Sequence, residues 1–210
     1  NGFDLSVLTS DQSQRGQLRA QCGFDKDDVV VGTLGRFNLD KDHANFVQAA
    51  GQLARRHPRL RFLMVGENLD ARNAVLMGWI EATGHADRFV LLGERSDVAV
   101  CLAAMDIFCL SSRTEAFPNV VGEAMAMGLP CVSTDVGDVG VLMADTGVLV
   151  PKADPAALAQ GVAGLMALGP AYREQMGQKA QERIRATFTM ACVRKRFEGI
   201  YENVIAKGTR

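Results

Sequence analysis

The stretch VVVGTLGRFNLDKDHANFVQAAGQLARRHPRLRFLMVG, residues 29–66, decides the fold class. It begins with an apolar run at 29–35, repeats apolar residues at helical spacing over 42–57, and ends in a second apolar run at 60–66. Strands that are apolar throughout are typical of a parallel sheet buried on both faces. The stretch therefore predicts two parallel strands joined by a helix.

The same alternation continues as far as residue 151. We expect further strands at 88–93, 106–111, 130–135 and 147–151, and helices at 71–84, 98–104 and 119–127. Beyond Pro151 the pattern is helical only, over 154–168, 171–188 and 190–207, and Asp154 before Pro155 is a good helix start. The sequence predicts an α/β fold: one domain, residues 1–210, with a doubly wound, Rossmann-like parallel sheet, flanking helices and C-terminal helices. The opening NGFDLSVL has turn chemistry, as expected of a fragment cut at a domain boundary.

The composition argues against a nucleic-acid-binding, a membrane-spanning and a disulfide-rich protein. The chain has 210 residues, 48% of them hydrophobic, and a net charge of −1, so overall charge gives no case for nucleic-acid binding. No apolar run approaches the roughly 20 residues that span a bilayer, and the first residues do not resemble a signal peptide. The five cysteines lie far apart without a CxxC pair, which predicts reduced core cysteines in a cytosolic protein and neither disulfides nor a zinc site.

Charged residues follow the first strand, where ligands bind in open α/β sheets. The loop GRFNLDKDH holds Arg36 and Lys41 just before a helix start. A guanidinium and an ammonium beside helix-terminal amides make a good diphosphate site, although solvated loop charges are an equally good interpretation of this loop alone. Neither G-x-G-x-x-G nor a Walker A pattern follows the strand.

The loop GERSDV follows the strand at 88–93. Gly93 permits close backbone approach, and Ser96 or Asp97 can cap the next helix. Arg95 could lie over a base or a phosphate, but a capped loop is the simpler interpretation.

The third loop contains EAFPNVVGE, residues 115–123. Pro118 suits the first helical turn, and the free amides of Asn119, Val120 and Val121 would then face an anion. Glu123, on the exposed end of this helix, could accept hydrogen bonds from two vicinal hydroxyls, and Glu115 from a sugar. Alternatively, Glu123 serves the helix dipole and Glu115 is a surface residue.

Together these motifs resemble the C-terminal, donor-binding domain of the retaining group 1, or family 4, glycosyltransferases of the two-domain GT-B fold. EAFPNVVGEAMAMGLPCVSTDVGD resembles the family's pair of glutamates, GTLGRFNLDKDH its basic phosphate loop, and NGFD the motif after its interdomain linker. RFVLLGERSDVAVCLAAMDIFCLSS and ADTGVLVPKADPAALA resemble flanking segments in the same order. Ala116 stands where the family often has glycine.

The resemblance implies a role for each matching residue. Arg36 and Lys41 would neutralise the diphosphate of a nucleotide sugar, and Glu115 would hold the sugar or its developing positive charge. Glu123 would hold the ribose. The remaining contacts would be largely through the backbone, at Glu94 and Arg95 for the base and at Phe117, Pro118, Asn119 and Val120 for the distal phosphate or sugar. No metal and no cofactor is implied.

The implied activity is retaining transfer of a hexosyl or N-acetylhexosaminyl group to a saccharide or lipid-linked acceptor, as in polysaccharide biosynthesis. The acceptor would bind an N-terminal domain outside this chain, so we expect the isolated chain to transfer little or nothing. We expect a cytoplasmic location, at the inner membrane face where the acceptor is lipid-linked.

Three alternatives stay open: a GT-B nucleotide-sugar epimerase, a catalytically idle binding module, and a membrane-surface module. The last alternative rests on basic residues of the terminal helices, although glutamates lie among them and offset their charge. These basic residues are Arg183, Arg185, Arg194, Lys195 and Arg196.

Overall fold

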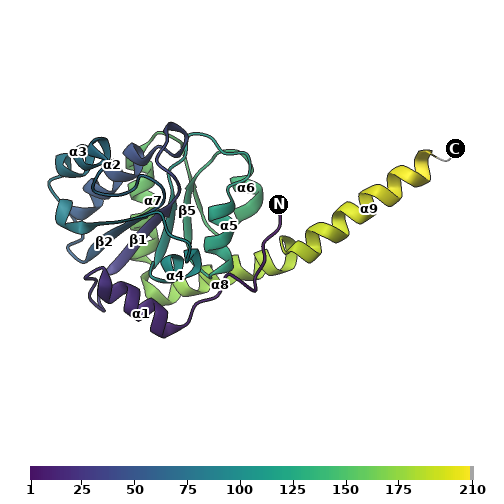
Figure 1. Ribbon diagram of the computed structural model, residues 1–210, viewed down its shortest axis with the longest axis horizontal. Helices are drawn as coiled ribbons and strands as arrows, with labels where there is room; N and C mark the ends of the chain where they lie inside the picture. The colour runs from purple at the N-terminus through teal and green to yellow at the C-terminus, as the bar shows by residue number, and fades with distance from the viewer. Residues whose placement is uncertain (209–210) are drawn as a thin grey trace.

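A single parallel sheet forms the centre of the computed structural model, which describes residues 1–208 (Figure 1). The six strands lie in the order β3-β2-β1-β4-β5-β6, and every neighbouring pair is parallel. Their bounds are β1 Val29–Leu34, β2 Leu60–Val65, β3 Phe89–Gly93, β4 Ile107–Leu110, β5 Cys131–Thr134 and β6 Val148–Val150. The predicted α/β, doubly wound parallel sheet is confirmed, with all six strands where the apolar runs placed them.

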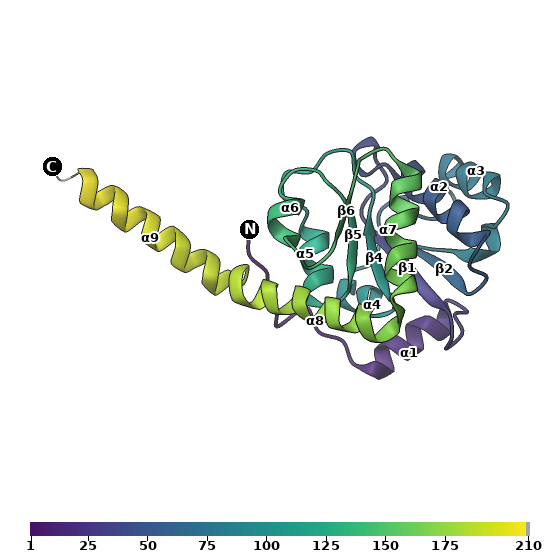
Figure 2. The same cartoon turned by 180° about the vertical axis from the view of Figure 1, so that it is seen from behind.

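Helices cover both faces of the sheet (Figure 2). One face carries α2 (His43–Ala54), α3 (Ala74–Ala82) and α7 (Pro155–Ala167). The other carries α1 (Gln12–Gln21), α4 (Val98–Ala103), α5 (Asn119–Ala126), α6 (Val139–Met143) and α8 (Gly169–Thr187). Helix α9 (Met190–Gly208) extends away from the body, and two short 3-10 helices, η1 (Leu39–Lys41) and η2 (Ala86–Arg88), lie in loops.

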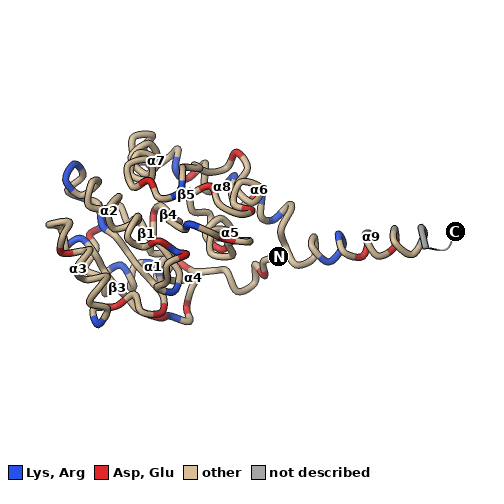
Figure 3. The backbone as a smooth tube through the Cα atoms, turned by 90° about the horizontal axis from the view of Figure 1, so that it is seen from above, with Lys and Arg blue, Asp and Glu red and all other residues tan. Residues whose placement is uncertain are grey.

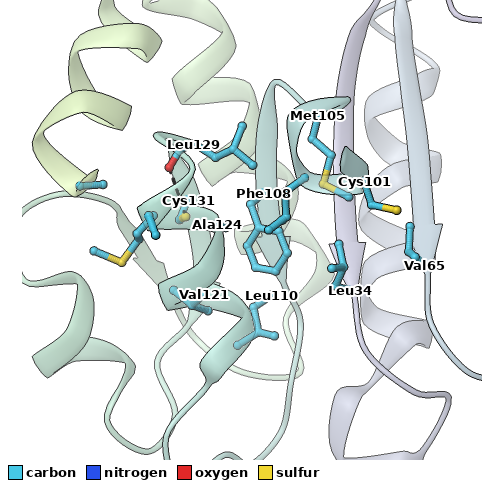
Figure 4. Packing of buried hydrophobic residues seen from close by; sticks show 14 of the residues in the cluster. Leu34, Val65, Cys101, Met105, Phe108, Leu110, Val121, Ala124, Leu129 and Cys131 are labelled. Atoms are coloured by element: carbon cyan, nitrogen blue, oxygen red, sulfur yellow. Dashed lines mark hydrogen bonds between the residues drawn. The ribbon is translucent and has the colours of Figure 1, made fainter. Parts of the chain in front are cut away.

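Alternate strand residues serve the two faces. Val30 and Leu34 of β1 belong to the cluster under α5, whereas Val31 belongs to the cluster under α2. This alternation follows from the two-residue repeat of a strand and explains why apolar residues run without interruption. Figure 4 shows Phe108 of β4 beside Ala124 of α5, so α5 starts from a fixed position on the sheet.

Helix α1 is absent from the expectations above, as is the five-residue helix α6. Asp11 and Gln14 form a reciprocal capping box, in which the Gln14 amide donates to Asp11 Oδ1 at 2.7 Å and the Asp11 amide donates to Gln14 Oε1 at 3.1 Å. Asp-x-x-Gln is a recognisable helix start, so the sequence carried this signal. Arg15 and Arg19 then bind the Asp106 carboxylate, which anchors α1 to the residue just before β4.

The opening NGFD segment is part of the packed domain. The Phe3 amide donates to the Phe188 carbonyl at 2.8 Å, and the Met190 amide donates to the Phe3 carbonyl at 3.2 Å. The buried Phe3 ring lies against α5, where a Cβ on Gly122 would come within 1.9 Å of it. The segment predicted as a turn therefore bridges α5 to the α8–α9 junction.

All five cysteines are free thiols in the structure. Cys101, Cys109 and Cys131 are buried, while Cys22 and Cys192 are partly exposed. Burial raises the pKa of Cys101 to about 11, so this thiol is protonated at neutral pH. Within residues 1–208, none of the helices combines the length and the apolar character that crossing a membrane requires.

Candidate functional site

A pocket lies at the carboxyl ends of β1 and β4, where the strand order reverses direction. Beyond β1 the chain moves outward to β2 and β3, and it then returns to the other side of β1 to form β4. The resulting crevice is the usual ligand site of an open α/β sheet. The pocket has a volume of about 240 Å³, and we call it the β1–β4 pocket; it is lined by Arg36, Asn38, Asp40, Lys41, Thr114, Glu115 and Ala116.

Lys41 and Glu115 meet in this pocket although they lie 74 positions apart in the chain. The Lys41 ammonium is 2.6 Å from Glu115 Oε1, and the Ser112 hydroxyl donates to the same oxygen at 2.7 Å. The Asn38 side chain accepts a hydrogen bond from the Lys41 amide at 3.0 Å. This bond caps the short helix η1, which contains Lys41. The ammonium is therefore held at the pocket in a defined position, and the Lys41 side chain remains one-fifth exposed.

Arg36 is exposed at the pocket, and its guanidinium has no carboxylate or carbonyl partner among the side chains and backbone that the structure describes. Its carbonyl oxygen lies 3.2 Å from Nε2 of the buried His43. Burial lowers the pKa of His43 to about 4, so the ring is neutral at pH 7. Because a carbonyl oxygen only accepts, Nε2 carries the proton, and this bond fixes the backbone at Arg36.

Residues 137–138 hold the backbone of the loop that carries Glu115. The Asp138 amide donates to the Ala116 carbonyl at 3.0 Å. Gly137 has φ +53, and a Cβ there would lie 2.0 Å from the Glu115 carbonyl oxygen. Only glycine fits this approach, so residues 137–138 fix the backbone at Glu115 and Ala116.

The start of α5 differs in two details from its prediction. Pro118 is the N-cap, one position before the first helical turn, and its carbonyl accepts from the Val121 amide at 3.1 Å. The expectation that the Val121 amide is free was therefore wrong, since this turn uses it. The Asn119 and Val120 amides have no backbone acceptor within residues 1–208, so two donors remain at the helix start. The Phe117 ring packs 6.1 Å from the rings of both Phe3 and Phe188, which leaves this residue only its backbone to offer.

Glu123 lies outside the β1–β4 pocket, in a groove of about 540 Å³ between the opening segment, α5 and α9. It was expected on the exposed end of its helix, but it is half-buried because the opening segment covers that side of α5. Desolvation raises the pKa of its carboxyl group. Its side chain has no hydrogen-bond partner in the described part of the chain, so both oxygens can accept from a ligand.

Glu94 and Arg95 follow β3, on the same edge of the sheet and two strands away from β1. Glu94 is exposed, and Arg95 forms a bidentate pair with Asp97 at 2.8 and 2.5 Å. Asp97 is the N-cap of α4 as expected, but its side chain makes no capping bond because Arg95 occupies it. The pairing lowers the pKa of Asp97 and leaves mainly backbone for ligand contact at this loop.

Two residues near the pocket were missed by the sequence analysis. Arg113 Nε donates to Asp42 Oδ2 at 2.7 Å, and the Arg113 amide donates to the Asp40 carbonyl at 2.7 Å. The polar run SSRT directly after a buried strand was the available signal, but which loop it would contact depends on the strand order.

The basic residues of the last two helices are partly engaged by the protein. Arg183 donates to the carbonyls of Leu142 and Val141, and Arg196 donates to that of Thr187. Arg194 lies 3.5 Å from the Glu198 carboxylate, and Figure 3 shows basic residues near the start of α9 followed by acidic ones.

Known proteins resemble this chain over most of its length. N-acetyl-alpha-D-glucosaminyl L-malate synthase of Bacillus anthracis is 27% identical over 191 residues, which cover 90% of this chain and 49% of that protein. Sucrose-phosphate synthase of Thermosynechococcus elongatus superposes with a TM-score of 0.83 at 26% identity, over 98% of this chain and 52% of that one. Alr3699/HepE of Anabaena, solved in complex with UDP-glucose, has the same fold, with a TM-score of 0.85 at 24% identity over 97% and 56% of the two chains. The chain spans about half the length of these proteins.

The family model described as "Glycosyl transferases group 1" matches residues 28–167, which include both β1 and the Glu115–Glu123 segment. This agrees with the resemblance seen in the motifs, and with the GT-B structures that share this sheet and its flanking helices. The chain belongs to the group 1 glycosyltransferases.

Proposed function

We propose that this chain is the donor-binding half of a retaining glycosyltransferase and binds a nucleoside-diphosphate sugar with its diphosphate in the β1–β4 pocket. One observation carries the proposal: the Lys41 ammonium and the unpaired Arg36 guanidinium lie together at the reversal point of the sheet. Two positive charges at such a crevice match the two negative charges of a diphosphate bridge.

The basic pair would also assist the chemistry. When the bond between the sugar and the diphosphate breaks, negative charge grows on the departing phosphate oxygen. Fixed positive groups at that position stabilise the transition state more than the ground state. We propose that Lys41, held by Glu115 and the η1 turn, and Arg36 fulfil this role without a metal ion.

The glutamates would bind the two ends of the donor. Glu115 uses Oε1 for Lys41 and Ser112, which leaves Oε2 for the sugar or its developing positive charge. Glu123 has two accepting oxygens for the ribose hydroxyls, and the free amides of Asn119 and Val120 would face a phosphate or sugar oxygen. The backbone at Glu94 and Arg95 would contact the base.

The named relatives support the donor class. Alr3699/HepE is described in complex with UDP-glucose, and the Bacillus anthracis relative is an N-acetylglucosaminyl-type synthase. A hexosyl or N-acetylhexosaminyl donor is therefore our proposal, with a saccharide or lipid-linked acceptor bound by an N-terminal domain. Cytoplasmic location, contact with the inner membrane face and participation in polysaccharide assembly stay predictions.

Titration calorimetry of the chain with UDP, GDP and ADP in turn tests the proposal. We expect one of them to bind, and we expect Lys41→Met to weaken that binding about 10- to 100-fold, the value of a charge-assisted hydrogen bond. Lys179→Met is the matched control, since it removes the same charge on the exposed surface of α8. EDTA should leave the affinity unchanged, and the isolated chain should transfer no sugar.

Two results would contradict the proposal. Absence of heat with all three nucleotides would leave only a scaffold, and equal affinity of Lys41→Met and Lys179→Met would place the phosphates elsewhere. Measurable sugar transfer by the isolated chain would overturn the assignment of the acceptor to another domain.

A further inference from the structure

We propose that Arg113 is a positioning residue for the diphosphate site, which acts by neutralising and holding Asp42 next to Lys41. The inference rests on the proposed function of the β1–β4 pocket. It concerns a residue that does not line this pocket and whose side chain is 60% exposed. Exposed ion pairs usually contribute little to stability. The reason for assigning a role to Arg113 therefore lies in its partner, Asp42.

The partner, Asp42, has an unusual position. It ends η1 and begins α2, and its backbone is left-handed, with φ 45 and ψ 53. Few residues other than glycine adopt this conformation, although aspartate and asparagine tolerate it best. Since Asp42 directly follows Lys41, its backbone angles help to determine where the Lys41 side chain points.

Asp42 is also a buried anion, with its side chain only 5% exposed. The Asn45 amide approaches Oδ1 at 3.4 Å, a long hydrogen bond, whereas Arg113 Nε donates to Oδ2 at 2.7 Å. Among the side chains that the structure describes, Arg113 is the only cation within salt-bridge distance of this carboxylate. Without it, a buried negative charge would lie one residue from the group that binds the diphosphate, and it would oppose anion binding.

Arg113 joins two loops that the chain brings together from different strands. Its amide donates to the Asp40 carbonyl at 2.7 Å, and Ser111, two residues earlier, donates through its hydroxyl to the Lys41 carbonyl at 2.8 Å. Three successive residues of the phosphate loop, 40–42, are therefore held by the segment after β4. The side-chain contact with Asp42 is the one that a substitution can remove without breaking the backbone bonds.

A double-mutant cycle tests this inference. We expect Arg113→Gln to weaken binding of the nucleotide found above about tenfold. Asp42→Asn combined with Arg113→Gln should recover most of the loss, because asparagine removes the buried charge, tolerates the left-handed backbone and can cap α2. Arg72→Gln is the control, since Arg72 is an exposed arginine paired with an aspartate, Asp70, outside the pocket.

Hydrogen exchange of the peptide 36–46 gives a readout that needs no ligand. In Arg113→Gln this peptide should exchange faster than in the wild type, while it should be unchanged in Arg72→Gln. Wild-type affinity and wild-type exchange in Arg113→Gln would overturn the inference. A double variant that binds as weakly as Arg113→Gln would also overturn it, because Arg113 would then act on the phosphate itself.

The two proposals fail in different ways. If the wild type binds a nucleotide and Lys41→Met does not, but Arg113→Gln binds normally, only the role proposed for Arg113 is refuted. If no nucleotide binds the wild type, the donor site is lost, and the exchange measurement still decides whether Arg113 holds the 36–46 loop.

Discussion

Glu123 shows at the scale of one residue how a proposed ligand-binding group can oppose stability. Its carboxyl group is half-buried in the groove beside α5, without a hydrogen-bond partner among the groups that the structure describes, and desolvation raises its pKa above the ordinary 4.5. An acid whose pKa is higher in the folded state binds its proton more tightly there. Ionisation therefore favours the unfolded chain as the pH rises above 4.5.

We predict that Glu123→Gln is at least as stable as the wild type at pH 7, because glutamine has the same shape without the charge. The difference in unfolding temperature should shrink as the pH falls towards 4.5, where the unfolded chain also begins to take up the proton. Nucleotide binding should weaken in the same variant. Thermal unfolding at several pH values checks the sign, and a variant that is less stable only at neutral pH would show that Glu123 has an ionic partner.

At the scale of the element, the packing of α5 against the opening segment depends on one glycine. A Cβ on Gly122 would meet the tip of the Phe3 ring at 1.9 Å, and the two backbone bonds of Phe3 to residues 188–190 limit how far that ring can move. The close contact sets the distance between α5 and the opening segment, and hence the width of the groove that contains Glu123.

We predict that Gly122→Ala lowers the free energy of unfolding by about 1–3 kcal/mol, as overpacking of a core usually does. The control is Gly78→Ala in α3, where a Cβ meets nothing within 4 Å. There the better helix propensity of alanine should stabilise the protein by about 0.5–1 kcal/mol. Urea unfolding measures both, and equal effects at the two positions would show that Phe3 yields freely.

The elements were largely predictable because their signals are local. Apolar runs identified every strand, and helical spacing identified every α-helix of the described chain except α1 and α6. Helix α1 carries a capping box at Asp11 and Gln14 but few apolar residues, so its pattern was missed. The side chain of Asp97 failed to cap α4 because Arg95, two residues earlier, competes for it.

At the scale of the whole molecule, the site was predictable only in part. Arg36, Lys41 and Glu115 could be named because each follows a recognisable strand at the carboxyl edge of the sheet. That the Lys41 ammonium touches Glu115, whereas Glu123 lies in another groove, follows from strand order and from the path of the opening segment. Neither is a local property, which is also why Arg113 and Asp42 were missed.

The position of the pocket between β1 and β4 has a consequence for the order of folding. Val30 and Asp106 meet at the start of these strands, 76 positions apart, so a long loop must close before the two strands can pair. Contacts of such separation form slowly, whereas the helices need only local contacts. In refolding from urea we therefore predict that far-ultraviolet circular dichroism recovers before nucleotide binding does. Simultaneous recovery of both signals would mean that β1 and β4 pair as early as the helices form. During synthesis on a ribosome, the residues up to 66 can emerge and begin to fold before Glu115, the partner of Lys41, has been added to the chain.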